Sequence, residues 1–190
     1  GIGQGLALSQ SSADGFYDDG SKVPCRGGYA FPAFAAGLRG TPTILMSFLQ
    51  DLIKAYHGEE SSKVSQETAR WMLDEEHLVD LGSIDFMGAK AGLGTFVAKA
   101  GPNRMMLHQA ANDGVRGVYL VCFDGPDKGK GFVIIANGDT PAVFLNSALS
   151  VLCLKKLNIQ GVDLTRVQNK EDSFDLSHIP QEQIVNLAYN

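Results

Sequence analysis

Residues 93–136 constrain the fold more than any other part of the chain, because β-type runs alternate there with turn-forming sequence. Four runs are rich in β-branched, aromatic and other apolar residues: 93–98, 105–108, 115–123 and 132–136. Pro, Gly, Asn and Asp gather at 102–104 and 124–131, where they favour turns. Because short connections join antiparallel neighbours, we expect an antiparallel sheet of about three to four strands. The run 132–136 is apolar throughout, which indicates burial on both faces or a central place in the sheet.

Helical patterns lie on both sides of these runs. Thr41 and Pro42 suit the N-cap and first position of a helix whose apolar residues recur at helical spacing until Gly58. A second helix is expected from Ser65, and a third from Thr140 through Leu157. The order helix, helix, strands, helix predicts an α+β fold, with helices packed on the sheet.

Composition narrows the class of protein. A chain of 190 residues with 44% hydrophobic residues can bury the core of one domain. We place that domain at 1–160 and expect a polar extension at 161–190, with a short helix from Pro180. The net charge of −5 and the lack of a basic run argue against nucleic acid and anionic membranes as partners. No apolar stretch has the length of a membrane span, and the compartment is left open.

The cysteines and histidines predict no cofactor. Cys122 and Cys153 lie in apolar runs and are expected to be buried, whereas Cys25 lies in a Pro/Gly loop. An odd number of widely spaced cysteines is no disulfide framework, and no pair of histidines has metal-ligand spacing. We therefore expect neither a metal nor another cofactor.

Several motifs occur in an order that matches a known family. Residues 13–24 read A-D-G-F-Y-D-D-G-S-K-V-P, and 29–42 hold Y-A-F-P followed by A-A-G-L-R-G-T-P. Further on, 108–114 read H-Q-A-A-N-D-G, and 131–139 read G-F-V-I-I-A-N-G-D. Together these resemble segments of the β-lactamase-related serine hydrolases (penicillin-binding-protein-like, class C type). The likeness covers about 13–157 and implies the C-terminal part of the β-lactamase/transpeptidase-like fold.

The resemblance implies a site around His108. In the family, H-G-G-x-N-x-G lies on an edge strand beside the active site, and its first residue holds substrate or assists proton movement. His108 takes that position and is the candidate catalytic residue, since imidazole titrates near neutral pH. The backbone N–H of Ala111 matches a donor of the oxyanion hole. Gln109, Ala110 and Asn112 would line the same cleft, although Gln109 and Ala110 stand where the family has glycines. A structural alternative is that His108 merely ends a strand.

The nucleophile that such an enzyme needs is missing from this chain. No Lys has a Ser three places before it, no Tyr has an Asn two places after it, and no G-x-S-x-G occurs. In the family, the S-x-x-K and Y-x-N motifs both lie upstream of the segments matched here. We therefore expect the chain by itself to be inactive.

Three functions fit these observations. The chain could be part of a serine hydrolase that cleaves esters, amides or peptides through an acyl-enzyme, with its nucleophile on a missing N-terminal half. It could instead be a non-catalytic binding or scaffolding relative that kept the fold, or a fragment with no independent role. A half-domain leaves a sheet edge and an apolar face open. The expected partner is therefore the N-terminal half or a second copy, with a homo-oligomer when the chain is alone.

Overall fold

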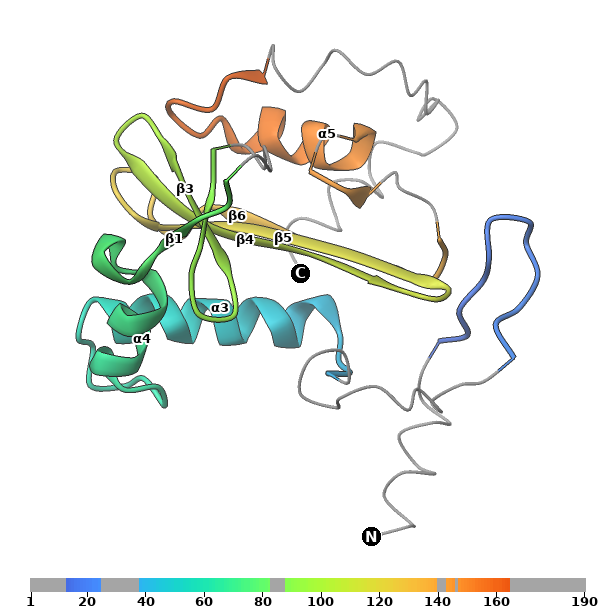
Figure 1. Cartoon of the computed structure of the whole chain (residues 1–190), viewed down its shortest axis with the longest axis horizontal. Coiled ribbons are helices and arrows are strands. Elements are labelled where there is room, and N and C mark those ends of the chain that lie inside the picture. The colour runs from blue at the N-terminus through green and yellow to red at the C-terminus, as the bar shows by residue number, and fades with distance from the viewer. Residues whose placement is uncertain (1–12, 25–37, 83–87, 140–142, 146, 165–190) are drawn as a thin grey trace, which may run out of the picture.

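A computed structural model describes residues 13–24, 38–82, 88–139, 143–145 and 147–164. It has three layers, with a central antiparallel sheet, helices α3 and α4 on one side and helix α5 on the other (Figure 1). The predicted α+β class is confirmed. Several predictions fall outside the described residues, namely the loop around Cys25, the motif residues 29–37 and the helix from Pro180.

The first two helices begin where the sequence predicts. Helix α3 spans Pro42–Tyr56, and the hydroxyl of its N-cap Thr41 accepts a hydrogen bond from the N–H of Ile44 at 3.2 Å. Helix α4 spans Gln66–Leu73 and has Ser65 as its N-cap. A short 3₁₀ turn, η1, follows at Glu75–His77.

The sheet has six strands in the order β1-β2-β3-β4-β5-β6, and every neighbouring pair is antiparallel. They span Val79–Asp80, Lys90–Ala91, Phe96–Ala100, Asn103–Asn112, Val115–Asp124 and Gly131–Ala136. The sequence prediction of three to four strands covers the last four and misses β1 and β2. Two residues are too few to form a recognisable alternation of apolar and polar side chains.

The apolar run of β6 does not place it at the centre of the sheet. Strand β6 pairs only with β5 in the described order, although helical layers lie on both sheet faces. Phe132 and Ile134 belong to the core on the α5 side, and Val133 packs on the α3 side. The apolar residues of β6 therefore contribute to the cores on both faces of the sheet. This agrees with the first of the two sequence interpretations and not with a central place in the sheet.

Helix α5 spans Ala148–Leu157, so the prediction that a helix starts at Thr140 is wrong. The described residues before it form turns, in which the N–H of Ser147 donates to the carbonyl of Phe144 at 2.9 Å. The hydroxyl of Ser150 donates to the carbonyl of Val143 at 2.6 Å. These bonds hold Val143 in a turn over the helix start, where it is buried. The apolar periodicity therefore begins before the true start of the helix, because the packed turn that precedes α5 also needs apolar residues.

Two apolar cores hold the layers together. On the α5 side, Leu107 and Leu120 of the sheet are packed in one core with Leu154 of α5. On the α3 side, Met106 and Val121 share a core with Leu52 of α3. Full burial of one such side chain contributes about 1.5–3 kcal/mol, so these cores dominate the stability of the sheet. Among the described helices, none is long and apolar enough to span a membrane.

Candidate functional site

The five residues from His108 to Asn112 form the last half of strand β4. Strand alternation places His108, Ala110 and Asn112 on the sheet face toward α3, and Gln109 and Ala111 on the face toward α5. Ala110 and Ala111 are exposed, and the other three are half-buried. The predicted site residues therefore lie on one accessible segment of strand.

This segment has an open edge. Strand β4 as a whole lies inside the sheet, but its pairing with β3 ends at Phe96 and Leu107. From His108 to Asn112, the described residues provide only β5 as a neighbour. The carbonyl of Leu107 faces β3, because it accepts from the hydroxyl of Thr95 at 3.2 Å. Since backbone groups alternate in direction along a strand, the N–H and C=O of Gln109 and Ala111 face the open edge.

The His108 ring lies at this edge between two aromatic rings. Its centroid is 5.2 Å from that of Phe96 and 6.3 Å from that of Tyr119. Its Nδ1 lies 2.7 Å from the carbonyl oxygen of Gln109. A carbonyl oxygen can only accept, so Nδ1 carries the proton and neutral His108 has its lone pair on Nε2. Among the described residues, this contact through Nδ1 is the hydrogen bond of the ring, and Nε2 makes none.

Tyr119, whose ring lies near that of His108, is held in place by a threonine. The hydroxyl of Tyr119 donates to Thr95 Oγ1 at 3.0 Å, and Thr95 is only 4% exposed. Burial raises the pKa of Tyr119, and the hydrogen bond between Tyr119 and Thr95 partly opposes this. Tyr119 therefore remains a neutral phenol at physiological pH and acts as a fixed wall of the site. Sequence reasoning missed both residues, which carry no motif of their own.

A second motif segment packs against the same end of the sheet. Residues 13–24 form a loop whose Phe16 bridges Gly138, with Phe16 N–H donating to the carbonyl of Asn137 at 3.1 Å. The backbone of Gly15 lies against Gly114, where a Cβ on Gly114 would come within 2.8 Å of Gly15 Cα. Gly114 also has a φ of +70°, which favours glycine. Close backbone contact therefore requires both glycines.

A carboxylate joins the two motifs at this corner. Asp139 Oδ1 accepts from the N–H of Gly114 at 2.7 Å and pairs with Arg116 Nη1 at 2.8 Å. Arg116 Nη1 also donates to the carbonyl of Asn112. Three motif segments, 13–24, 108–114 and 131–139, thus meet at one corner although more than a hundred residues separate the first from the last. This corner is called the motif corner below.

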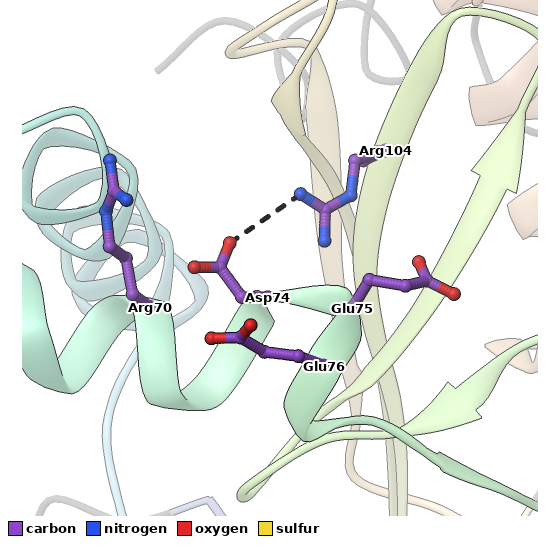
Figure 2. A pocket seen from close by; sticks show the side chains of 5 residues that line it. All are labelled: Arg70, Asp74, Glu75, Glu76 and Arg104. Carbon is purple, nitrogen blue, oxygen red and sulfur yellow. Dashed lines mark ion pairs between the residues drawn. The ribbon is translucent and has the colours of Figure 1, made fainter.

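A second cluster lies at the other end of β4, where Arg70, Asp74, Glu75, Glu76 and Arg104 line an open cleft of about 600 Å³ (Figure 2). Arg104 Nη1 donates to the hydroxyl of Tyr56 at 2.7 Å, which in turn donates to Asp74 Oδ1 at 2.7 Å. The guanidinium also donates to the carbonyl of Leu73 and lies 4.8 Å above the ring centre of Phe123. Arg104 thereby joins α3, α4 and the sheet. Sequence reasoning had no signal for it, because a single Arg in a strand is not distinctive.

Glu75 completes this cluster as an ion-pair centre. It accepts from Lys90 Nζ at 2.9 Å and pairs with Lys99 Nζ at 3.1 Å. Hydrogen bonds from Lys90 and then Lys99 lower the pKa of Glu75 to about 2. In Figure 2, Glu75 points away from Asp74, whose ion pair with Arg104 is drawn.

Two cysteines lie within the described residues, and the prediction of burial is confirmed for Cys122. Cys122 is buried and Cys153 half-buried, and both are free thiols. Burial raises the pKa of Cys122 to about 11 and also raises that of Cys153, so neither is a ready nucleophile. The described residues contain no group of three or more side chains that could hold a metal ion.

Comparison with known proteins adds no assignment: no family model, no curated protein and no solved structure matches this chain. The functional argument therefore rests on the residues and their geometry.

Proposed function

We propose that this chain is part of a β-lactamase-like serine hydrolase and supplies the His108 side of its active site. The reaction would be acyl transfer from an ester, amide or peptide to a serine, followed by hydrolysis. The serine, lysine and tyrosine would come from a companion segment. His108 Nε2 would accept or return a proton, and the N–H of Ala111 would stabilise the oxyanion.

The observation that carries this proposal is the meeting of three motif segments beside an open strand edge. Chance likeness in three short stretches has no reason to bring them together, yet Gly114, Asp139 and Phe16 are in direct backbone or side-chain contact there. His108 lies on the same strand, and its Nε2 has no hydrogen bond to another described residue. The backbone groups of Gln109 and Ala111 lie on the same edge, where an extended substrate could pair with them.

The surface near α3 supports the need for a companion. Ile44 and Phe48 on α3 are 62% and 49% exposed, and Ile135 on β6 is 41% exposed. Helix α3 packs against β5 and β6, so these side chains belong to neighbouring elements on one side of the sheet. Apolar side chains gathered in this way favour a partner surface. The companion segment would cover them and place its serine opposite His108.

The direct test is complementation. The coding sequence upstream of Gly1 is examined for S-x-x-K and Y-x-N, and that segment is produced together with this chain. We expect no turnover of nitrocefin or nitrophenyl acetate by the chain alone, and turnover when the segment is present. Loss of that turnover on substitution of the S-x-x-K serine supports the proposal. An upstream sequence with neither motif, or a completed protein that turns over no ester, amide or peptide probe, contradicts it.

A non-catalytic binding relative is the second candidate, because of Gln109 and Ala110. The exposed methyl of Ala110 stands beside Gly117 on the face toward α3, where it narrows the space above the strand. A binding protein would tolerate the narrower space above the strand. A hydrolase with the same space would accept only substrates small enough to enter it. A completed protein that binds an ester or peptide with no turnover would favour this candidate.

The association state is a separate test. With its apolar residues near α3 uncovered, the chain alone should form dimers or larger species. Light scattering that gives a monomer for the chain alone would contradict this expectation. Addition of the companion segment should convert the oligomer to a one-to-one complex.

A further inference from the structure

Gln109 accepts two hydrogen bonds, one through its side chain and one through its backbone carbonyl. Its side-chain Oε1 accepts a hydrogen bond from the N–H of Leu145 at 2.9 Å, on the sheet face toward α5. Leu145 is itself buried at 2% exposure, so the donor is held in place by the core. The backbone carbonyl of the same residue accepts from His108 Nδ1 at 2.7 Å at the open edge.

We propose that Gln109 is a positioning residue that sets the protonation pattern of His108. Its carbonyl holds the proton on Nδ1, and its amide side chain holds the carbonyl in place through Leu145. The free base is therefore fixed on Nε2, which faces away from the carbonyl. This inference rests on the proposed function for its catalytic meaning, but the protonation pattern exists in the chain alone.

The physical reason lies in the unpaired edge. The carbonyl of Gln109 faces the edge where pairing with β3 has ended, so it lacks the strand partner that the carbonyl of Leu107 has on the same side. A free imidazole prefers the proton on Nε2, which would leave the lone pair on Nδ1. A firm acceptor at Nδ1 reverses that preference. The hydrogen bond from Leu145 restrains Gln109, because leaving a buried N–H donor without an acceptor is destabilising.

The likeness to the hydrolase family gives this residue a distinct meaning. A glycine at position 109, as in the resembling motif, would have a carbonyl but no side chain to reach Leu145. Gln109 therefore compensates for the open edge in a manner specific to this chain.

The experiment reads the ring nitrogens of His108 directly. Long-range proton–nitrogen correlation spectra of the ¹⁵N-labelled chain are recorded at about pH 9, above the usual titration range of histidine. His108→Ala assigns the signals. We expect the Nδ1–H form in the parent chain. In Gln109→Met the ratio of Nδ1–H to Nε2–H forms should fall roughly two- to fivefold, because the support of the carbonyl is lost but the carbonyl remains.

Two further variants separate positioning from general damage. Gln109→Glu keeps an oxygen that can accept from Leu145 and should keep the parent ratio. Gln50→Met makes the same exchange at an exposed position of α3 and should leave the ratio unchanged. A parent chain in the Nε2–H form, or a Gln109→Met ratio equal to the parent ratio, overturns the inference. Absence of ester turnover in the completed protein would defeat the proposed function alone, because these spectra need no catalysis.

Discussion

Arg104 and His108 lie four residues apart on strand β4, and both side chains lie on the sheet face toward α3. Their surroundings nevertheless differ completely. Arg104 is enclosed by Tyr56, Leu73, Asp74 and Phe123, and its Nε is buried without a partner among the described residues. His108 has one nitrogen bound and the other available.

Under the proposed function, one strand would contribute to stability at its Arg104 end and to the reaction at its His108 end. A charged group whose donors are directed at protein atoms has little left for a ligand, so the cleft beside Arg104 is best explained as a structural ion-pair cluster. The half-buried His108 ring uses one nitrogen for a hydrogen bond to Gln109 and makes no such bond through the other among the described residues. Burial and perturbed ionisation alone would select the Arg104 end of β4, whereas the proposed function selects the His108 end.

The largest effect should follow Arg104→Met. The change removes the donors to Tyr56 and Leu73 while keeping apolar contact with Phe123. The free energy of unfolding should fall by about 2–4 kcal/mol, because buried acceptors lose a charged donor. Urea unfolding followed by circular dichroism measures it. A decrease in the free energy of unfolding of less than about 0.5 kcal/mol would show that the contacts of Arg104 contribute no more to stability than those of an exposed ion pair.

Gly114→Ala should come next. Its Cβ would collide with the backbone of Gly15, and the residue would keep a positive φ. We expect a loss of about 1–3 kcal/mol and release of residues 13–24 from the motif corner. Limited proteolysis should then cut within 13–24 much faster than in the parent. Gly129→Ala offers the matched control, since it also has positive φ but meets no atom within 4 Å.

His108→Ala should change stability less than Arg104→Met or Gly114→Ala. The ring is half-buried and gives up one hydrogen bond and two ring contacts. The free energy of unfolding should fall by about 1 kcal/mol or less. A loss as large as that of Arg104→Met would make His108 a structural residue and remove the contrast.

The pH dependence of the Glu75 ion pairs should be the smallest effect. The folded pKa of about 2 lies below the ordinary 4.5, so the stabilisation is present above pH 4.5 and is lost as pH falls toward 2. Its size should stay under about 1 kcal/mol, because the side chain is 46% exposed and solvent screens the pairs. The stability difference between the parent and Glu75→Gln should therefore shrink between pH 4.5 and 2. A stability difference that stays constant over this pH range would contradict the prediction. Glu59→Gln is the control for the loss of one carboxylate.

The elements that the sequence predicted well have local causes. Thr41 and Ser65 cap helices through their own hydroxyls, and the turn at 124–131 has its residues adjacent in the chain. The prediction around Thr140 failed because a turn packed by Val143 and Leu145 shares the apolar pattern of a helix. The predicted residues His108 to Asn112 share one strand segment, as consecutive residues of a strand must.

What the sequence could not reveal depends on contacts between distant segments. Tyr119 lies beside His108 only because β5 pairs with β4, and its hydroxyl reaches Thr95 across the strand. The bond from Leu145 to Gln109 joins residues 36 positions apart across the sheet. Neither pairing leaves a spacing rule that a single sequence could display.

The most direct test of the account is the rate of nitrophenyl acetate hydrolysis by the completed protein carrying His108→Ala. If His108 moves a proton in the reaction, kcat/KM should fall about a hundredfold to ten-thousandfold while unfolding stays within about 1 kcal/mol of the parent. A folded His108→Ala protein that hydrolyses the ester at the parent rate would contradict the account.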